Sequence, residues 1–176
     1  MAQKLISSTL PRKVVYSDSA SICNVVVSEP NPEKRATAVE MGADLTVDPS
    51  KDDAAEYIRT NTEKNDGLGV AATLDFVGLP QTMEFALSLL RKGGHHVHVG
   101  LFGGAYSLSM PPLAFKMLRI SGSYVGTLEE FRELVELVKS GMDLSIPITN
   151  RPLTEAADAL RDLKDGTIVG RIVLNP

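Results

Sequence analysis

The stretch KVVYSDSASICNVVVSEPNPEKR, from Lys13 to Arg35, predicts how the fold begins. It holds two β-branched runs, Val14–Tyr16 and Val25–Val27, which favour strands. The second run ends in Ser28-Glu29, and Asn31-Pro32-Glu33 then supplies a capping side chain, a first-turn proline and an acid for a helix start. A strand that ends in an acid before a helix indicates a nucleotide ribose site. The glycine-rich phosphate loop that normally precedes such a strand is not seen in the sequence.

Outward from this stretch, strand and helix patterns alternate along the chain. Residues 2–9 look like the end of a helix, closed by Pro11. We expect strands at residues 13–17, 24–28, 45–47, 70–77, 97–100, 106–109, 118–125 and 168–174. We expect helices at residues 31–41, 51–61, 80–92 (stopped by Gly93-Gly94), 128–140 and 154–164. The alternation predicts a doubly wound parallel α/β sheet in one domain, residues 1–176, which binds ligands at the carboxyl ends of its strands.

Composition excludes several classes of function. The chain has 43% hydrophobic and 23% charged residues, a net charge of −4 and no Lys/Arg cluster, so we expect no nucleic-acid or anionic-membrane partner. We find no secretory signal and no apolar run long enough for a membrane span, which indicates the cytoplasm. The one cysteine, Cys23, excludes an internal disulfide and a multi-cysteine zinc site.

Glu29 and Lys34 are the first candidates for cofactor binding. The Glu29 carboxylate, at the end of a strand, could accept both hydroxyls of an adenosine ribose. On spacing alone, a surface glutamate at a strand end is an equal alternative. Lys34, in the first turn of the next helix, could reach the same ribose, although spacing alone favours a solvated lysine.

Three other features have both a functional and a structural explanation. Gly78 and Gly100 each end a strand, which permits close approach of a flat ligand or simply a turn. Arg171 lies among apolar residues of the last strand and needs either an anionic partner or a water-facing edge.

The histidines and the cysteine do not predict a catalytic or metal site. His96 and His98 share one strand face, but neither they nor His95 have an acid or cysteine nearby in sequence to complete a metal site. Cys23 has no neighbouring base, and no nucleophile elbow occurs. We therefore assign no catalytic residue and no metal ligand.

Several segments together resemble the NAD-binding half of zinc-dependent, medium-chain alcohol dehydrogenases. They are NVVVSEPNPEKRATAVEMGAD, TLDFVGLPQTMEFALSLLRKGGHHVHVGLFGG, RISGSYVGTLEEFRELVELVKSG and DGTIVGRIVLNP, in the order and spacing of the family. The resemblance runs from residue 24 onward. It implies a Rossmann-like fold and an NAD-linked oxidoreductase of alcohols or polyols.

The resemblance also implies roles for individual residues. Glu29 matches the ribose-binding acid and Lys34 its supporting lysine. Loop positions that line the cofactor riboses match Phe76, Val77, Gly78, Val99, Gly100 and Leu101. Positions near the carboxamide match Ser123 and Val125, and Arg171 matches an arginine that holds a cofactor phosphate.

The chain departs from the family in ways that bear on activity. The zinc-ligand domain, the first strand and the glycine loop are all missing from the expected pattern, so we expect zinc only in the parent family. MAQKLISS resembles the helix that follows the glycine loop. We expect weak or no NAD binding and no alcohol turnover by this chain alone. The alternative is a non-catalytic nucleotide-binding or dimerisation module, pairing through residues 106–125.

A missing first strand would leave the centre of the sheet unpaired, because that strand is central in the 3-2-1-4-5-6 order. Two explanations of the opening stretch remain. In one, Tyr16–Val25 is an inserted loop, and the runs at Val14-Val15 and Val26-Val27 compete for one strand position. In the other, residues 13–17 fill the empty central position and residues 24–28 take the second.

Overall fold

The computed structural model describes residues 3–7, 24–62, 69–142 and 146–176 of the chain. These residues form two compact units, Met1–Ser123 and Tyr124–Pro176. The first unit contains the following elements: β1 (Gln3–Ser7), β2 (Asn24–Ser28), α1 (Pro32–Glu40), β3 (Leu45–Val47), α2 (Ala54–Asn61), β4 (Val70–Asp75), α3 (Pro80–Leu89), β5 (Leu90–His98), α4 (Met110–Phe115) and β6 (Arg119–Gly122).

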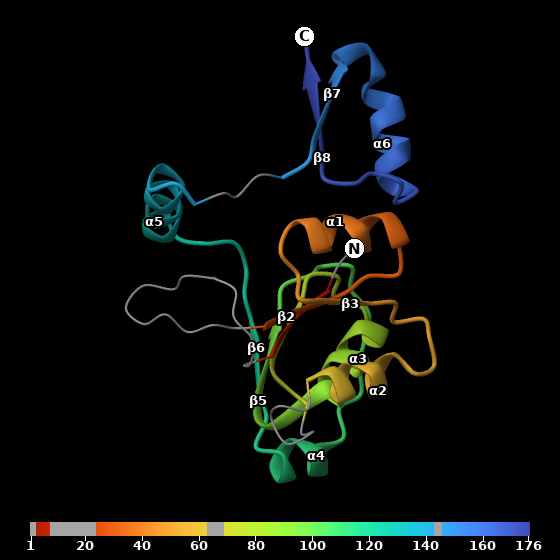
Figure 1. The fold of residues 1–176 in the computed structure, drawn as a ribbon, viewed down its shortest axis with the longest axis vertical. Coiled ribbons are helices and arrows are strands. Elements are labelled where there is room, and N and C mark those ends of the chain that lie inside the picture. Colours follow the sequence, from red (N-terminus) through yellow and green to blue (C-terminus); the bar gives the residue numbers. More distant parts are fainter. Residues whose placement is uncertain (1–2, 8–23, 63–68, 143–145) are drawn as a thin grey trace. The chain divides into compact units, whose positions relative to one another are not determined.

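The first unit is built on a six-stranded sheet with the order β3-β2-β1-β4-β5-β6. Figure 1 labels its strands β2, β3, β5 and β6 and its helices α1 to α4. This is the strand order of a Rossmann-like α/β fold, which confirms the predicted fold class. The sheet is mixed, however. β1 pairs antiparallel with β2 on one side and with β4 on the other, whereas the remaining neighbours pair in parallel.

The prediction that residues 2–9 end a helix is wrong, because Gln3–Ser7 forms the central strand. The second explanation of the opening stretch is wrong for the same reason: the position that it gave to residues 13–17 is taken by β1. Residues 13–17 themselves, and the predicted Tyr16–Val25 insertion as far as Cys23, lie outside the described residues, whereas its last two residues, Asn24 and Val25, belong to β2. β1 supplies backbone partners to β2 and β4 at once, which outweighs local helical preference in a short segment.

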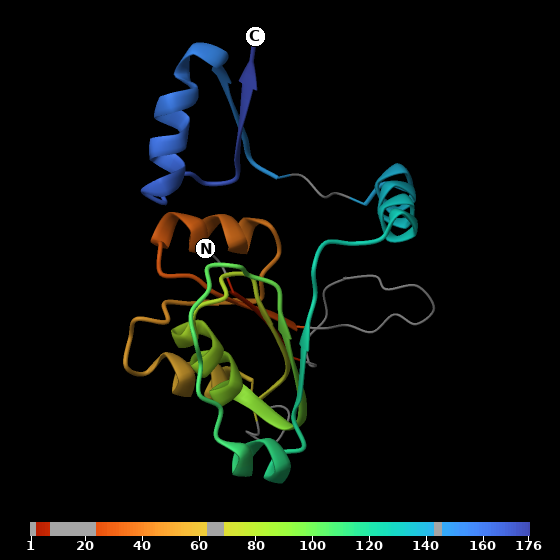
Figure 2. The same cartoon turned by 180° about the vertical axis from the view of Figure 1, so that it is seen from behind.

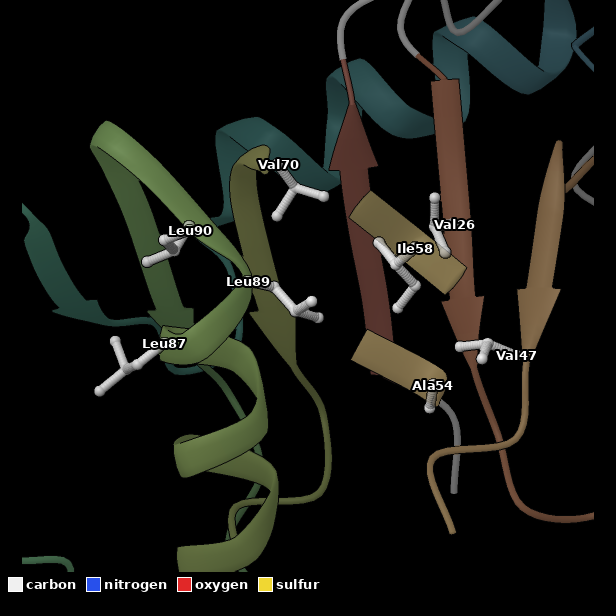
Figure 3. Close-up of a cluster of buried hydrophobic side chains, with 8 residues drawn as sticks. All are labelled: Val26, Val47, Ala54, Ile58, Val70, Leu87, Leu89 and Leu90. Carbon is white, nitrogen blue, oxygen red and sulfur yellow. The ribbon is translucent and has the colours of Figure 1, made fainter. Parts of the chain in front are cut away.

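The core of this unit lies between the sheet and the helices α2 and α3, which contact each other (Figures 2 and 3). α2 contributes Ala54 and Ile58, four residues apart and therefore on one face of the helix. β2 is buried along its whole length, as expected for a strand covered on both faces. The buried cluster consists of Val26, Val47, Ala54, Ile58, Val70, Leu87, Leu89 and Leu90 (Figure 3).

The predicted end of the helix at residue 92 and the predicted start of the next strand at residue 97 are both wrong. α3 ends at Leu89 and β5 begins at Leu90, so Gly93-Gly94 lies inside a strand and does not stop the helix. The register between β4 and β5 shifts at this place, between Val70 and Ala72, which accommodates the extra residues in an irregularity of the strand. No strand forms at residues 106–109.

The second unit contains α5 (Leu128–Lys139), β7 (Ile148–Pro152), the short 3-10 turn η2 (Leu153–Glu155), α6 (Ala156–Lys164) and β8 (Arg171–Asn175). β7, which the sequence did not predict, pairs in parallel with β8. The predicted capping box is confirmed: Thr127 Oγ1 accepts from the Glu130 N–H, and Glu130 accepts from the Thr127 N–H. The hydrogen bond from the Thr127 backbone N–H, and to a smaller extent the hydrogen bond with the Thr127 hydroxyl, lower the pKa of Glu130.

No helix in the described part of the chain is both long and apolar enough to cross a membrane.

Candidate functional site

The parallel strands of the first unit all end at one edge of the sheet. β2 and β4 run in the same direction because each is antiparallel to β1, and β3, β5 and β6 are parallel to their neighbours. The candidate residues that follow these strands therefore gather at the carboxyl edge. They are Glu29 and Lys34 after β2, Phe76, Val77 and Gly78 after β4, Val99, Gly100 and Leu101 after β5, and Ser123 after β6.

Glu29 is a buried carboxylate at the end of β2, with 1% of its surface exposed. Its Oε1 accepts a hydrogen bond of 2.9 Å from the Asn31 N–H, and its own N–H donates to the Val47 carbonyl on β3. The side chain is thus held at the turn between β2 and α1. This burial argues against the surface-glutamate alternative.

The start of α1 is fixed around Glu29. Asn31 caps the helix, accepting from the backbone N–H groups of Glu33 and Lys34. Lys34 is half-buried in the first turn. Arg35 donates to the carbonyl oxygens of Glu29 and Pro30, at 2.6 and 2.8 Å.

The same Arg35 guanidinium lies 3.4 Å from Asp48 Oδ2, at the end of β3. It therefore ties the β2–α1 turn to the neighbouring strand end, a positioning role that sequence reasoning missed. An arginine one turn after a helix-capping asparagine is the signal that could have indicated it.

Asp75 organises the turn between β4 and α3. The residue is fully buried, and its Oδ1 accepts from the Val77 and Gly78 N–H groups at 2.8 and 3.0 Å. Its Oδ2 accepts from the Thr82 hydroxyl at 2.7 Å. The Asp75 carbonyl accepts from the N–H groups of Val99 and Gly100. One residue thus shapes both loops, and sequence reasoning did not select it as a functional position.

Gly78 and Gly100 bring the two loops into direct backbone contact. A Cβ added to Gly78 would lie 2.2 Å from the Gly100 carbonyl oxygen, and one added to Gly100 would lie 2.1 Å from the Val77 carbonyl carbon. Gly78 also has a φ of +78°, which favours glycine. The two glycines therefore serve close packing of loop on loop, which is neither of the two roles weighed from the sequence.

The remaining edge residues differ in exposure. Val77 is buried, whereas Phe76 is 45% and Leu101 76% exposed, so these two present apolar surface beside the glycine contact. Ser123 is exposed, and its N–H donates to the His98 carbonyl at the end of β5.

Val125 and Arg171 belong to the second unit. Val125 is exposed and has a φ of +48°, an uncommon value for a β-branched residue. Arg171, at the start of β8, is exposed and donates to the Gly170 carbonyl oxygen at 3.1 Å. Within its unit, Arg171 has the water-facing position that was the structural alternative to an anion site.

The histidines have neighbours that sequence proximity did not reveal. Asp75 pairs with His98 across β4 and β5, and Asp75, His96 and His98 each place one ligand atom within 4.8 Å of the others. The acid that appeared to be missing comes from the adjacent strand. The expectation of no metal ligand stays a prediction.

The sequence and the fold both match known dehydrogenases. The family described as zinc-binding dehydrogenase matches residues 19–140. An alcohol dehydrogenase of Geobacillus stearothermophilus is 32% identical over 86% of this chain and 43% of its own length. An NAD-dependent alcohol dehydrogenase of Sulfurisphaera tokodaii is 31% identical over 89% of this chain and 44% of its own.

Among solved structures, the alcohol dehydrogenase of Aeropyrum pernix matches with a TM-score of 0.77 and 30% identity, over 86% of this chain and 42% of that one. The chain thus spans less than half the length of these relatives. With the Rossmann-like strand order and the family match over residues 19–140, the chain belongs to the zinc-binding dehydrogenases and corresponds to their C-terminal, NAD-binding half.

Proposed function

We propose that the carboxyl edge of the first unit binds the adenosine part of NAD. The observation that carries the proposal is the buried Glu29 carboxylate, held at the end of β2 on the same edge as the Gly78–Gly100 contact. A carboxylate at this position can accept both ribose hydroxyls and repels a 2′-phosphate, so the site selects NAD over NADP. The exposed side chains of Phe76 and Leu101 would provide the apolar surface for the flat groups.

The phosphate part of such a site is weaker in this chain. In a Rossmann fold the first strand runs toward the carboxyl edge and leads into a helix whose N-terminus meets the pyrophosphate. Here β1 is antiparallel, so Gln3 lies opposite Ser28 at that edge and Ser7 lies opposite Asn24 at the other. β1 therefore leads away from the site. We expect NAD affinity well below that of a complete Rossmann domain.

In the parent enzyme we propose NAD-linked oxidation of an alcohol or polyol, with the ligands of the catalytic zinc outside this chain. The name of the Sulfurisphaera tokodaii relative, an NAD-dependent alcohol dehydrogenase, supports this reaction class. Zinc would polarise the alcohol oxygen, and the residues described here would bind and orient the cofactor. The chain by itself would not turn over alcohols.

Replacing Glu29 tests the cofactor proposal. In Glu29→Gln the side-chain oxygen still accepts from the Asn31 N–H, but the charge that strengthens the ribose hydrogen bonds is lost. We expect NAD binding, measured by calorimetric titration, to weaken about tenfold or more, the equivalent of one charge-assisted hydrogen bond.

Glu33→Gln is the matched control, because it removes the same charge from an exposed position in the first turn of α1. It should leave NAD affinity within about twofold. Equal losses in the two variants, or none in Glu29→Gln, would rule out Glu29 as the ribose ligand.

A second candidate function, self-association, is favoured by the edge strand β6. It ends the sheet order, and all four of its residues are exposed. Ser123 donates to β5, and donors alternate along a parallel ladder, so the N–H of Ile120 faces the unpaired edge. A second copy of the chain could pair there, within the segment 106–125.

A proline at residue 120 tests whether two copies of the chain pair through β6. Ile120→Pro removes the outward donor, whereas Ile120→Thr keeps it. In sedimentation velocity we expect the wild type and the threonine variant to dimerise and the proline variant to remain monomeric. A dimer that persists in Ile120→Pro would place the interface elsewhere.

A further inference from the structure

Four polar side chains occupy one face of the sheet where β4 and β5 pair. Thr73 lies opposite His96 and Asp75 opposite His98, and residues two apart on a strand share a face. Thr73, Asp75 and His96 are fully buried, whereas the side chain of His98 is 40% exposed. The cluster therefore extends from the interior to the surface at the carboxyl edge.

His96 is unusual within this cluster. Its Nδ1 hydrogen-bonds to Thr73 Oγ1 at 2.9 Å, but its Nε2 is buried and finds no hydrogen-bond partner among the described residues. A buried polar nitrogen without a partner costs free energy.

The Asp75 carboxylate is held in place by hydrogen bonds that still allow its Oδ2 to coordinate a metal ion. Its Oδ1 accepts from the N–H groups of Val77 and Gly78, whereas Oδ2 accepts from the Thr82 hydroxyl and lies 4.0 Å from His98 Nδ1. Outer hydrogen bonds of this kind commonly orient metal ligands.

We propose that Asp75, His96 and His98 bind a divalent transition-metal ion of the zinc class. One ligand atom from each residue lies within 4.8 Å of the other two. In a tetrahedral site with bonds of about 2.0–2.1 Å, ligand atoms are about 3.4 Å apart. His98, whose Nδ1 lies 4.0 Å from Asp75 Oδ2, has the most exposed side chain of the three and therefore the most freedom to approach the other ligands.

The ligand chemistry sets the ion and the open position. Two imidazoles with one carboxylate suit zinc and its neighbours rather than magnesium or calcium, which prefer oxygen ligands. Three protein ligands leave a fourth position for water or a ligand oxygen. The proposed ligands are distinct from the residues proposed to contact the cofactor, although Asp75 and His98 lie directly before two of the loops that carry those residues.

The test is metal titration of the full chain after treatment with a chelator. We expect one Zn²⁺ per chain by calorimetry, and Co²⁺ to give the intense visible absorption of a four-coordinate site. His98→Gln, at the half-exposed position, and Asp75→Asn should each weaken Zn²⁺ binding at least tenfold and abolish that absorption. Circular dichroism and thermal unfolding establish that each variant is folded.

His95→Gln is the matched control. His95 neighbours His96 but lies on the opposite face of β5, where its Nε2 bonds to Ser121 Oγ at 2.8 Å. It should leave Zn²⁺ affinity unchanged. The proposal fails if Zn²⁺ does not bind stoichiometrically, if folded His98→Gln binds as the wild type does, or if His95→Gln removes binding equally.

Discussion

Gly78→Ala should destabilise the first unit by more than about 4 kcal/mol, a loss seen only when a substitution cannot be accommodated. The added Cβ would lie 2.2 Å from the Gly100 carbonyl oxygen, which belongs to the backbone and cannot rotate away. The two loops would have to separate. The bonds from Phe102 to the Val77 carbonyl and from Gly103 to the Gly78 carbonyl would then be lost as well.

Gly103→Ala separates this clash from backbone strain. Gly103 has a φ of +91°, close to the +78° of Gly78, but a Cβ there would meet nothing within 4 Å. It should lose only about 1–2 kcal/mol, the cost of a left-handed conformation. Urea unfolding followed through the amide resonances of β4 and β5 measures both. Equal losses would show that the loops are not in backbone contact.

Leu5→Pro should be the second large effect, because β1 is paired on both edges. Proline removes the backbone N–H, and in a central strand this breaks a ladder bond with one of the two neighbours. We expect a loss of about 1–3 kcal/mol, the cost of leaving a backbone group of the sheet without its partner. Amide hydrogen exchange should become faster in β2 and β4 together, since β1 joins the two halves of the sheet.

Leu5→Val is the control for this experiment, because it keeps the N–H and introduces a residue that favours strands. Its exchange rates in β2 and β4 should remain close to those of the wild type. If Leu5→Pro also leaves exchange in β2 and β4 unchanged, Gln3–Ser7 does not form the central strand.

Sequence reasoning was most accurate where the signal is local. The helix α1 starts where Asn31 and Pro32 indicated, and Gly42 ends it with a φ of +99°. Glu29 follows its strand as expected. Each of these features depends on residues within one turn of each other, so that one sequence is enough to predict them.

The errors concern pairings between distant segments. Gln3–Ser7 is a strand because β2 and β4 both need hydrogen-bond partners along one edge. No residue within the segment QKLIS indicates this requirement. Likewise, Asp75 meets His98 only because β4 and β5 are neighbours in register. The signal available was an acid at the end of one predicted parallel strand and histidines at the end of the next.

The adenosine site is tested most directly by mapping NAD onto the chain through the amide resonances of isotope-labelled protein. NAD should shift resonances at the carboxyl edge, in Glu29–Asn31, Phe76–Gly78 and Val99–Leu101, and NADP should shift them less. Shifts confined to other segments, or none at millimolar NAD, would contradict the assignment of this edge as the adenosine site.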